Sequence, residues 1–371
     1  MPTLREIIDV LEKTAPTHLA EEWDNVGLQV GQLNRPVKRI WVALDPLLPV
    51  VSEACREGVD LLITHHPLIF PALKAIDFNT PVGAVIQTAV QSHLAIFSAH
   101  TNLDRAVNGV NDILARRIGL KNVRGLGNAS GTDLYKLVLF VPAEYEQQVL
   151  SAVFETRARK TGDYLSRAFR HAGTGTLRAS ADDTSSEPSP DGLLDFEEAR
   201  IETLADKDDI AAVIDRIQAG RPGLKMTYDV FPLWPREDKQ GLGRVGELEE
   251  SMPLDRFAEM VKHKLQLPSL TVAGKRDLTV KKVALCSGSG GSLIDRFLIS
   301  KADVFVSGDL RYHDAREAES RNLGLIDVGH FASEHIVVEE LAVRLQNIFS
   351  GRQMDVTVEA CKLEKDPFYT V

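Results

Sequence analysis

The segment LAIFSAHTNLD (residues 94–104) has the pattern that decides the fold, a short apolar strand that runs directly into polar side chains. The segment LGLIDVGHFASE (323–334) repeats this pattern near the other end of the chain. In each segment a histidine follows the strand and an acidic residue comes four positions later: His100 with Asp104, and His330 with Glu334. This repeated pattern indicates that one structural unit occurs twice in the chain.

Two further pairs of segments support an internal duplication. VALD (42–45) corresponds to VALCSG (283–288), and VDLLITHH (59–66) corresponds to ADVFVSGD (302–309). The three pairs occur in the same order in both halves of the chain. That order favours a duplication over the alternative, two unrelated β-α-β runs that look alike because buried parallel strands share an apolar composition.

Apolar strand patterns alternate with amphipathic helix patterns in both halves. Expected strands cover residues 40–44, 59–64, 93–98, 282–286, 302–306 and 324–328, and expected helices cover 50–57, 82–91, 108–118, 294–300 and 315–320. An opening helix is predicted within residues 1–16, where Thr3 and Glu6 form a capping box. Such alternation predicts a mostly parallel sheet with helices on both faces, so the fold class is α/β with a duplicated three-layer core.

The segment between the two halves, residues 131–236, has a different organisation. It contains a strand over 134–142, a helix over 144–157, a hairpin-like stretch over 164–178, a strand over 197–203, a helix over 208–219 and a strand over 224–233. The order β-α-β-β-α-β predicts an inserted ferredoxin-like α+β domain. Residues 179–192 are rich in Ser, Pro and Asp, which predicts a mobile loop. The expected domains are therefore the first half of the core (1–130), the insert (131–236) and the second half of the core (237–371).

The composition is that of a soluble globular protein. Of the 371 residues, 44% are hydrophobic and 26% are charged, and the formal net charge is −10. An acidic chain repels phosphate backbones, which disfavours nucleic acid as a partner. The chain has three scattered cysteines, no signal-peptide pattern and no apolar run of bilayer length. These features predict a cytoplasmic protein that does not enter a membrane.

Five side chains that can bind a metal lie where predicted strands end. They are His65, His66, Asp104, His330 and Glu334. In doubly wound sheets, ligands bind beyond the carboxyl ends of the strands. Imidazole and carboxylate together suit Zn, Fe, Mn or Ni better than Ca or Mg. Five ligands exceed one tetrahedral site, so we expect two divalent ions, about 4 Å apart, that share Asp104 or Glu334.

Each of these residues also has an ordinary structural explanation. Neighbouring histidines in an extended strand point to opposite faces, so His65 and His66 would not both bind unless the chain turns before Pro67. His330 and Glu334 can simply begin a helix. Because histidines and acids occur together at three strand ends, the metal hypothesis is favoured for the set as a whole.

Two further groups of residues are weaker candidates. His100 is a candidate for orienting a metal ligand, and Asp309 and His313 for exchanging a proton with metal-bound water; the alternative is a structural hydrogen bond near a turn. The glycine-rich run after strand 282–286 is a candidate phosphate-binding loop through Ser287, Gly288, Ser289 and Gly290. It lacks the full phosphate-loop and dinucleotide patterns, so a tight strand-to-helix turn is the favoured alternative.

Six motifs spread over both halves resemble those of the NIF-three-like proteins, a family also described as GTP cyclohydrolase I type 2 homologues. The motifs are EEWDNVGLQVG (21–31), ITHHPLIF (63–70), SAHTNLD (98–104), GLGRVGEL (241–248), SGDLRYHDA (307–315) and GHFASE (329–334). The insert is similar to the PII/CutA-like domain of the family's long bacterial members. The resemblance implies a two-metal site at His65, His66, Asp104, His330 and Glu334. It also implies a toroidal homohexamer, either a trimer of dimers or a dimer of trimers.

Two functions are consistent with these features. The first is a metal-dependent hydrolase for a nucleotide, a related heterocycle or a phosphoester, in which water activated by the two ions attacks the substrate. The resemblance implies GTP as the substrate, but the chain offers few anchors for three phosphates beyond residues 287–292 and arginines such as Arg105 and Arg311. The second is non-enzymatic metal delivery or regulation, which the insert favours because such domains more often bind ligands than catalyse. The sequence leaves open whether the chain is an enzyme.

Overall fold

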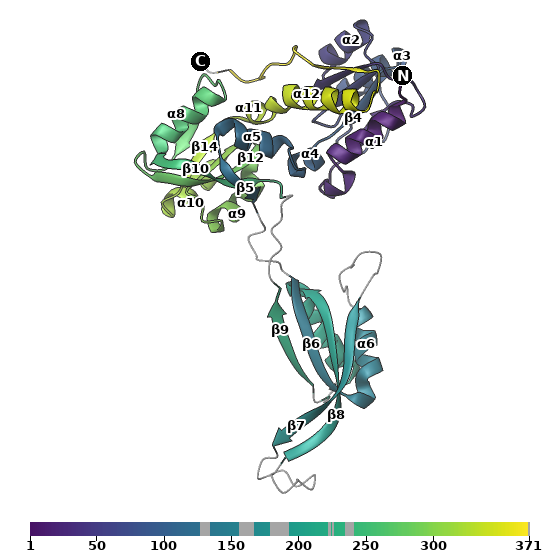
Figure 1. Ribbon diagram of the computed structural model, residues 1–371, viewed down its shortest axis with the longest axis vertical. Coiled ribbons are helices and arrows are strands. Elements are labelled where there is room, and N and C mark those ends of the chain that lie inside the picture. Colours follow the sequence, from purple (N-terminus) through teal and green to yellow (C-terminus); the bar gives the residue numbers. More distant parts are fainter. Residues whose placement is uncertain are drawn as a thin grey trace. The chain divides into compact units, whose positions relative to one another are not determined.

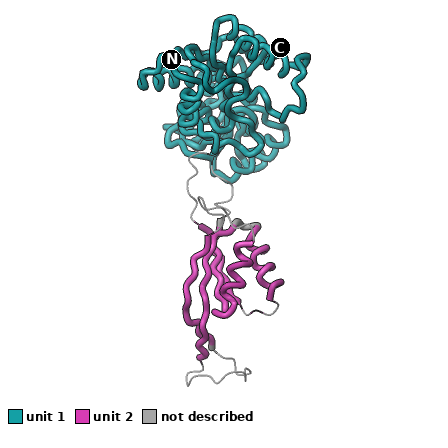
Figure 2. Tube along the Cα trace, turned by 90° about the vertical axis from the view of Figure 1, so that its right-hand side faces the viewer, with its two compact units in different colours: residues 1–129, 237–371 teal, residues 130–236 magenta. Residues whose placement is uncertain are grey.

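The computed structural model (Figure 1) describes residues 1–126, 134–155, 167–178, 193–221, 224, 226–233 and 241–369. The chain forms two compact units, drawn in different colours in Figure 2. Residues 1–129 and 237–371 form the core unit, and residues 130–236 form the inserted unit. The mobile loop expected over residues 179–192 lies outside the described residues.

The core unit contains two sheets, and the first is built mostly from the N-terminal half of the chain (Figure 1). Its strands are, in spatial order, β1 (Gly27–Val30), β4 (Ala95–Ser98), β3 (Leu61–Thr64), β2 (Arg39–Ala43) and β15 (Thr357–Ala360). Strands β4, β3, β2 and β15 are parallel, whereas β1 is antiparallel at the edge. Every residue of β3 and β4 is buried, which explains their uninterrupted apolar sequences.

The second sheet repeats this plan. Its strands are, in spatial order, β11 (Thr271–Ala273), β14 (Gly324–Asp327), β13 (Val304–Gly308), β12 (Thr279–Ser289), β10 (Arg244–Pro253) and β5 (Lys121–Gly125). The parallel strands β12, β13 and β14 correspond to β2, β3 and β4, and the antiparallel edge strand β11 corresponds to β1. Asp60 and Asp303 occupy equivalent places, since each carboxylate accepts two backbone N–H groups at the start of β2 or β12. This matched order is what an internal duplication predicts.

The helices of the core unit follow the same repeat. The first half contributes α1 (Leu4–Thr14), α2 (Leu48–Arg56), α3 (Pro81–Gln91), α4 (Thr101–Arg105) and α5 (Val110–Ile118). The second half contributes α8 (Leu254–Lys264), α9 (Ile294–Ile299), α10 (Tyr312–Ser320), α11 (His330–Glu334) and α12 (Ile336–Gly351). The capping box of α1 is confirmed, because Thr3 and Glu6 bond to each other's backbone N–H groups. The short helices α4 and α11 follow β4 and β14. Helix α4 was not among the expected helices, whereas a helix that begins at His330 was the structural alternative to a ligand role.

The two halves of the core unit exchange elements, which local sequence patterns did not indicate. Helix α5 belongs to the first half, yet Leu114, Ala115 and Ile118 pack in the core of the second sheet. Helix α12 belongs to the second half, yet its buried residues, including Val337 and Phe349, pack in the core of the first sheet (Figure 1). Likewise, β5 joins the second sheet beside β10, and β15 joins the first sheet beside β2. Each half therefore completes the sheet of the other.

Arg244 connects the two halves at a buried position. Its side chain is 1% exposed and pairs with Asp112 of α5. Its guanidinium also donates to four backbone carbonyls, those of Arg105, Ala106, Gly241 and Gly243. Removing such a group leaves a half-buried carboxylate without its ion-pair partner and several carbonyls without their donor.

We therefore expect Arg244→Ala to destabilise the core unit by about 3–5 kcal/mol, the typical cost of breaking a buried ion pair. Denaturant unfolding of the full chain measures this change. Arg256→Ala is the control, because Arg256 is exposed on α8 and its loss should change stability by less than about 1 kcal/mol. Equal effects of the two substitutions would contradict the connecting role of Arg244.

The inserted unit has its own sheet and core. Its elements are β6 (Leu134–Pro142), α6 (Glu146–Glu155), β7 (Ala168–Arg178), β8 (Leu193–Asp206), α7 (Lys207–Gly220) and β9 (Thr227–Pro232). The sheet order is β7-β8-β6-β9, with every neighbouring pair antiparallel. The expected hairpin within residues 164–178 is wrong, because residues 168–178 form the single strand β7. Gly173 and Gly175, which lie within this stretch, pair in register with β8.

Candidate metal site

The candidate ligands converge at the carboxyl ends of strands from both sheets. His65 and His66 follow β3, Asp104 lies in α4 after β4, and His330 and Glu334 begin and end α11 after β14. The ring centroids of His65 and His66 are 5.1 Å apart, so the two side chains do not point to opposite faces. The Thr64 hydroxyl donates to the carbonyl of His66 (2.8 Å), which holds the turn in the chain at this point.

Glu334 lies at the centre of this cluster. Its Oε2 is 3.0 Å from Nε2 of His66 and 3.0 Å from Nε2 of His330, and its Oε1 is 3.6 Å from Nε2 of His65. Asp104 approaches from the other side, with Oδ1 3.7 Å from Nε2 of His65. Glu334 is only 4% exposed. A buried carboxylate among three imidazoles has the position expected of a ligand that bridges two ions.

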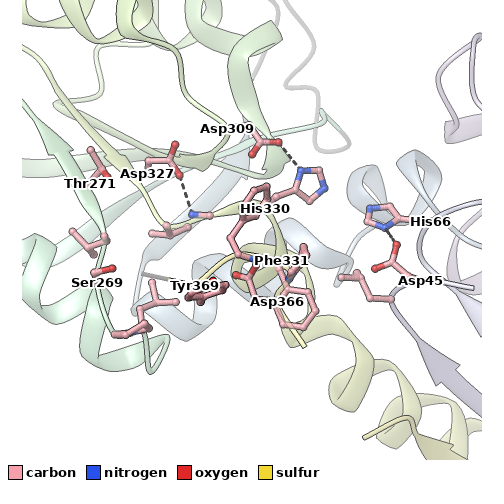
Figure 3. Close-up of a pocket in the computed structure, with 18 residues that line it drawn as sticks. Asp45, His66, Ser269, Thr271, Asp309, Asp327, His330, Phe331, Asp366 and Tyr369 are labelled. Carbon is pink, nitrogen blue, oxygen red and sulfur yellow. Dashed lines mark hydrogen bonds and ion pairs between the residues drawn. The ribbon is translucent and has the colours of Figure 1, made fainter. Parts of the chain in front are cut away.

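The Nδ1 atom of each histidine in the cluster donates a hydrogen bond to an acceptor outside the cluster. The acceptors are Asp45 for His66 (2.8 Å), Asp309 for His330 (2.8 Å), Asp24 for His100 (2.9 Å) and the carbonyl of Ala99 for His65 (2.9 Å). Figure 3 shows the pairs His66–Asp45 and His330–Asp309. A hydrogen bond donated from Nδ1 leaves the lone pair on Nε2, which is the form in which imidazole binds a metal.

The donor set fits divalent ions. Within the described part of the chain, His65 Nε2 is buried and makes no hydrogen bond, although buried polar atoms normally find a partner. Potential ligand atoms within 4.8 Å of one another form two groups that share His66: His65, His66 and His100, and His66, His330 and Glu334. Two ions bound by imidazole and carboxylate would satisfy these atoms, and the donor types suit Zn, Fe, Mn or Ni.

The carboxylates of the cluster favour positive charge on the histidines. Burial lowers the pKa of His66, but Asp45 and Glu334 outweigh it and raise the pKa to about 10. Contact with Glu334, supported by Asp309, raises the pKa of His330 to about 9 against the effect of burial. Burial raises the pKa of Asp104. Burial acts in the same direction on Glu334, but the surrounding histidines hold its pKa well below the usual value.

Three residues lie differently from their expected roles. The ring centroid of His100 is 5.1 Å from that of His65 and 5.5 Å from that of His66, so His100 is placed as a direct donor as well as an orienting residue. Asp309 does not reach into the cluster but holds His330 from behind. His313 is exposed on α10 with its ring against Tyr312, and it belongs to neither donor group in the described part of the chain.

Residues 287–290 form a wall of the cluster. The Ser287 hydroxyl donates to Asp104 (3.1 Å), the Ser287 N–H donates to Asn111 (2.7 Å), and the Gly288 N–H donates to the Ser333 hydroxyl (2.8 Å). Ser289 ends β12, and Gly290 begins the short 3-10 helix Gly290–Leu293. Because two of these N–H groups already have partners within the chain, a phosphate-binding role for this run stays a prediction.

Asp24 and Asp45 were not identified as site residues from the sequence. Asp24 bonds to His100 and to the backbone N–H of Thr101; burial would raise its pKa, but these bonds lower it to about 2. Asp45 lies two residues after the end of β2, the first parallel strand of the repeat. A usable signal was present, because Asp45 is an acid at a strand end like the ligands themselves, and Asp24 lies in the motif at residues 21–31.

The fold and the cluster define an α/β protein with a repeated core and a candidate histidine–carboxylate metal site between its halves. The chain belongs to the Duf34/NIF3 (NGG1p interacting factor 3) family, whose model matches residues 2–367. A Bacillus subtilis (strain 168) relative named "GTP cyclohydrolase 1 type 2 homolog" is 36% identical over 365 residues, which cover 98% of this chain and 97% of the relative. A Halalkalibacterium halodurans relative with the same name is 35% identical over 363 residues, 98% of this chain and 97% of the relative.

Solved structures agree with this assignment. A Bacillus cereus protein related to NIF3 is 37% identical, with a TM-score of 0.68 over 100% of this chain and 99% of that chain. A Staphylococcus aureus protein is 29% identical, with a TM-score of 0.68 over the same shares of the two chains. In the described part of the chain, no helix combines the length and the apolar character that crossing a membrane requires.

Proposed function

We propose that the core unit binds two divalent metal ions through His65, His66, Asp104, His330 and Glu334 and uses them to hydrolyse a small molecule. One observation carries this proposal: the Nε2 atoms of His65, His66 and His330 converge on the buried carboxylate of Glu334, while Nδ1 of each ring already has a hydrogen-bond partner. A buried histidine with only a structural role would have hydrogen-bond partners for both ring nitrogens, whereas Nε2 of His65 has none. Zn, Fe, Mn or Ni would suit the ligands.

The residues of the chain have separate tasks in such a site. When bound, the ions would supply a water acidic enough to react at neutral pH. Glu334 contacts histidines of both groups of donors, and Ser287 orients Asp104. Asp45 and Asp309 orient His66 and His330 and increase the basicity of their Nε2 atoms.

The names of the relatives support a substrate from the class of nucleotides, related heterocycles or phosphoesters, with a GTP cyclohydrolase-like reaction as the nearest precedent. The alternative is a non-enzymatic role in metal delivery or regulation. The inserted unit favours this alternative, because it has a separate core and its β-α-β-β-α-β order with sheet order β7-β8-β6-β9 suits a ferredoxin-like, PII/CutA-like ligand-binding domain.

The wider organisation expected from the family resemblance belongs to the same proposal. We propose a toroidal homohexamer in the cytoplasm, with a first core half at residues 1–130, an insert at 131–236 and a second core half at 237–371. Sedimentation analysis of the full chain tests the assembly, and a monomer at micromolar concentration would contradict it.

Metal analysis followed by a hydrolysis assay tests the function. Protein purified without chelators is expected to hold about two ions per chain, and metal-loaded protein is expected to hydrolyse a member of a panel of nucleotides, nucleosides and phosphoesters. Fewer than about one ion per chain would contradict the two-metal site. Full metal content with no hydrolysis, together with transfer of the ions to a metal-free acceptor, would favour the delivery role instead.

The affinity for metal is expected to rise with pH. Protons compete for Nε2 of His66 and His330, whose pKa values are raised from 6.5 to about 10 and about 9. Because these folded-state values are raised, protonation stabilises the metal-free fold fully below pH 6.5, and that stabilisation is lost as the pH rises through 9 and 10.

Thermal unfolding between about pH 6 and pH 10 checks this prediction on both forms of the protein. The metal-free protein should lose stability across the alkaline half of this range, and the metal-loaded protein, as the matched control, should change less. A metal-free protein whose unfolding temperature rises with pH would contradict the expected loss of stability at alkaline pH.

A further inference from the structure

Two exposed aromatic side chains, Trp23 and Phe70, lie beside the candidate metal site on the side of His100. Their ring centroids are 5.7 Å apart, with the planes inclined at 60°. The centroid of His100 is 6.2 Å from that of Trp23 and 6.4 Å from that of Phe70. Since His100 belongs to the donor group of His65 and His66, this aromatic pair borders the atoms that would hold one of the ions.

The two rings are presented to solvent rather than packed in a core. Trp23 is 59% exposed and Phe70 is 52% exposed. Isolated apolar side chains on a surface are ordinary, but large rings that meet beside a cluster of polar groups are typical of ligand sites. Because the two planes are inclined, a flat group can lie on the face of one ring and contact the edge of the other, an arrangement that aromatic groups favour.

Side-chain hydrogen bonds fasten the two segments that carry the rings. The Asn25 amide donates to the carbonyl of Ile69 (2.5 Å), and the Ile69 N–H donates to the amide oxygen of Gln29 (3.2 Å). The Gln29 amide in turn donates to the carbonyl of Asn25 (3.0 Å). The segment before β1, which carries Trp23, is thereby tied to the connection between β3 and α3, which carries Phe70.

The segment before β1 also fixes the aromatic pair relative to the candidate ligands. Asp24, the neighbour of Trp23, accepts hydrogen bonds from Nδ1 of His100 (2.9 Å) and from the backbone N–H of Thr101 (3.1 Å). The same few residues therefore orient a candidate ligand and carry one of the rings. A surface whose parts are held in place before binding loses little conformational entropy when a ligand arrives. The aromatic pair is thus a preformed surface at a fixed place beside the candidate metal site.

We propose that Trp23 and Phe70 bind a planar ring of the substrate and place its reacting bond beside the ions. This inference rests on the proposed hydrolase function and narrows its substrate class. Nucleosides, nucleotides and free heterocycles have a flat ring that can lie on the aromatic pair, whereas alkyl phosphoesters and sugar phosphates do not. The contact with His100 favours a substrate over a partner protein, because a molecule on these rings lies next to the metal-binding atoms.

Calorimetric titration of the metal-loaded full chain with matched probes tests the need for a planar ring. Guanosine and adenosine are compared with ribose, which is the same sugar without the base. Each nucleoside is expected to bind at least about tenfold more tightly than ribose, since stacking of one base on an aromatic side chain contributes this much or more. Ribose that binds as tightly as the nucleosides, or the absence of binding by both nucleosides, would overturn the proposal.

Replacement of single rings tests the two residues themselves. Trp23→Ala and Phe70→Ala should each weaken nucleoside binding by about tenfold, and Trp23→Phe and Phe70→Tyr, which keep a ring, should restore most of it. Phe78→Ala is the matched control and should bind nucleoside normally, because Phe78 is also 52% exposed and lies in the same connection between β3 and α3. Normal affinity in either alanine variant of the pair, or an equal loss in the control, would refute the role of the pair.

Metal content and assembly separate this inference from the function on which it rests. The alanine variants should keep about two ions per chain, because neither ring is a metal ligand. Metal-loaded protein that binds no nucleoside contradicts the role of the aromatic pair and leaves the two-metal site standing, whereas protein that holds no metal contradicts the proposed function itself. If the double variant Trp23→Ala/Phe70→Ala changes the sedimentation of the chain but not nucleoside binding, the pair is an interface between copies and the proposal is wrong.

Discussion

Replacing Glu334 with glutamine is expected to empty the metal site while the core unit stays folded. The Glu334 carboxylate lies within 3.0 Å of two imidazole nitrogens and 3.6 Å of a third, so it contacts histidines of both groups of donors. An amide has the same shape but no charge, and its NH₂ group cannot bind a cation. Loss of an outer partner typically costs about 10–100-fold in metal affinity, so loss of the central ligand should cost more than about 100-fold.

Metal analysis of the purified Glu334→Gln protein measures this effect, with hydrolysis of the best panel substrate as a second readout. Glu339→Gln is the control, because Glu339 is exposed on α12 only five positions further along the chain. Circular dichroism should show that both variants keep their helices. A Glu334→Gln protein that retains both ions would remove Glu334 from the site, whatever its activity.

Gly288→Ala is expected to disturb the same carboxylate through the backbone. Gly288 has φ +61°, and a Cβ at this position would lie 2.1 Å from Oε1 of Glu334 and 3.4 Å from Nε2 of His330. Left-handed backbone costs a residue with a Cβ about 1–2 kcal/mol, and overpacking adds about 1–3 kcal/mol. We therefore expect a lower free energy of unfolding together with loss of metal, because Glu334 must move.

Gly58→Ala separates the cost of the positive φ from the cost of the clash with Glu334. Gly58 also has a positive φ, +67°, but a Cβ there would meet nothing within 4 Å. This control should lose only about 1–2 kcal/mol of stability and should keep its metal. Denaturant unfolding and metal analysis of the two variants make the comparison. A Gly288→Ala protein with normal metal content would show that Glu334 is not held against this backbone.

The candidate ligands could be recognised from the sequence because they follow strands. Buried parallel strands such as β3 and β4 have continuous apolar sequences, and their carboxyl ends meet at one edge of a sheet. His65 and His66 stand directly after β3, and Asp104 follows β4 within the short helix α4. The repeat predicted a similar place for His330 and Glu334. Their convergence on one cluster agrees with that reasoning.

Which of the weaker candidate residues contact the cluster could not be predicted from the sequence. His100, Asp309 and His313 have similar places in the sequence, but only the packed structure turns His100 toward His65 and leaves His313 exposed. Gly288 was a weak candidate for a phosphate-binding loop, with a tight strand-to-helix turn as the favoured alternative, and in the structure its lack of a side chain makes room for Glu334. Contacts of this kind join residues far apart in the chain, and local patterns carry no information about them.

The sequence by itself determined the class of the fold, the repeat of its β-α units and the residues that can bind metal. It could do so because hydrophobic periodicity and residue chemistry are local properties. The tertiary structure decided that α5 and α12 pack on each other's sheets, that Arg244 connects the halves and that Glu334 is placed between three histidines. The sequence of an amphipathic helix shows that one face must be buried, but several sheets can bury that face equally well. Only the packing of the whole core selects the sheet.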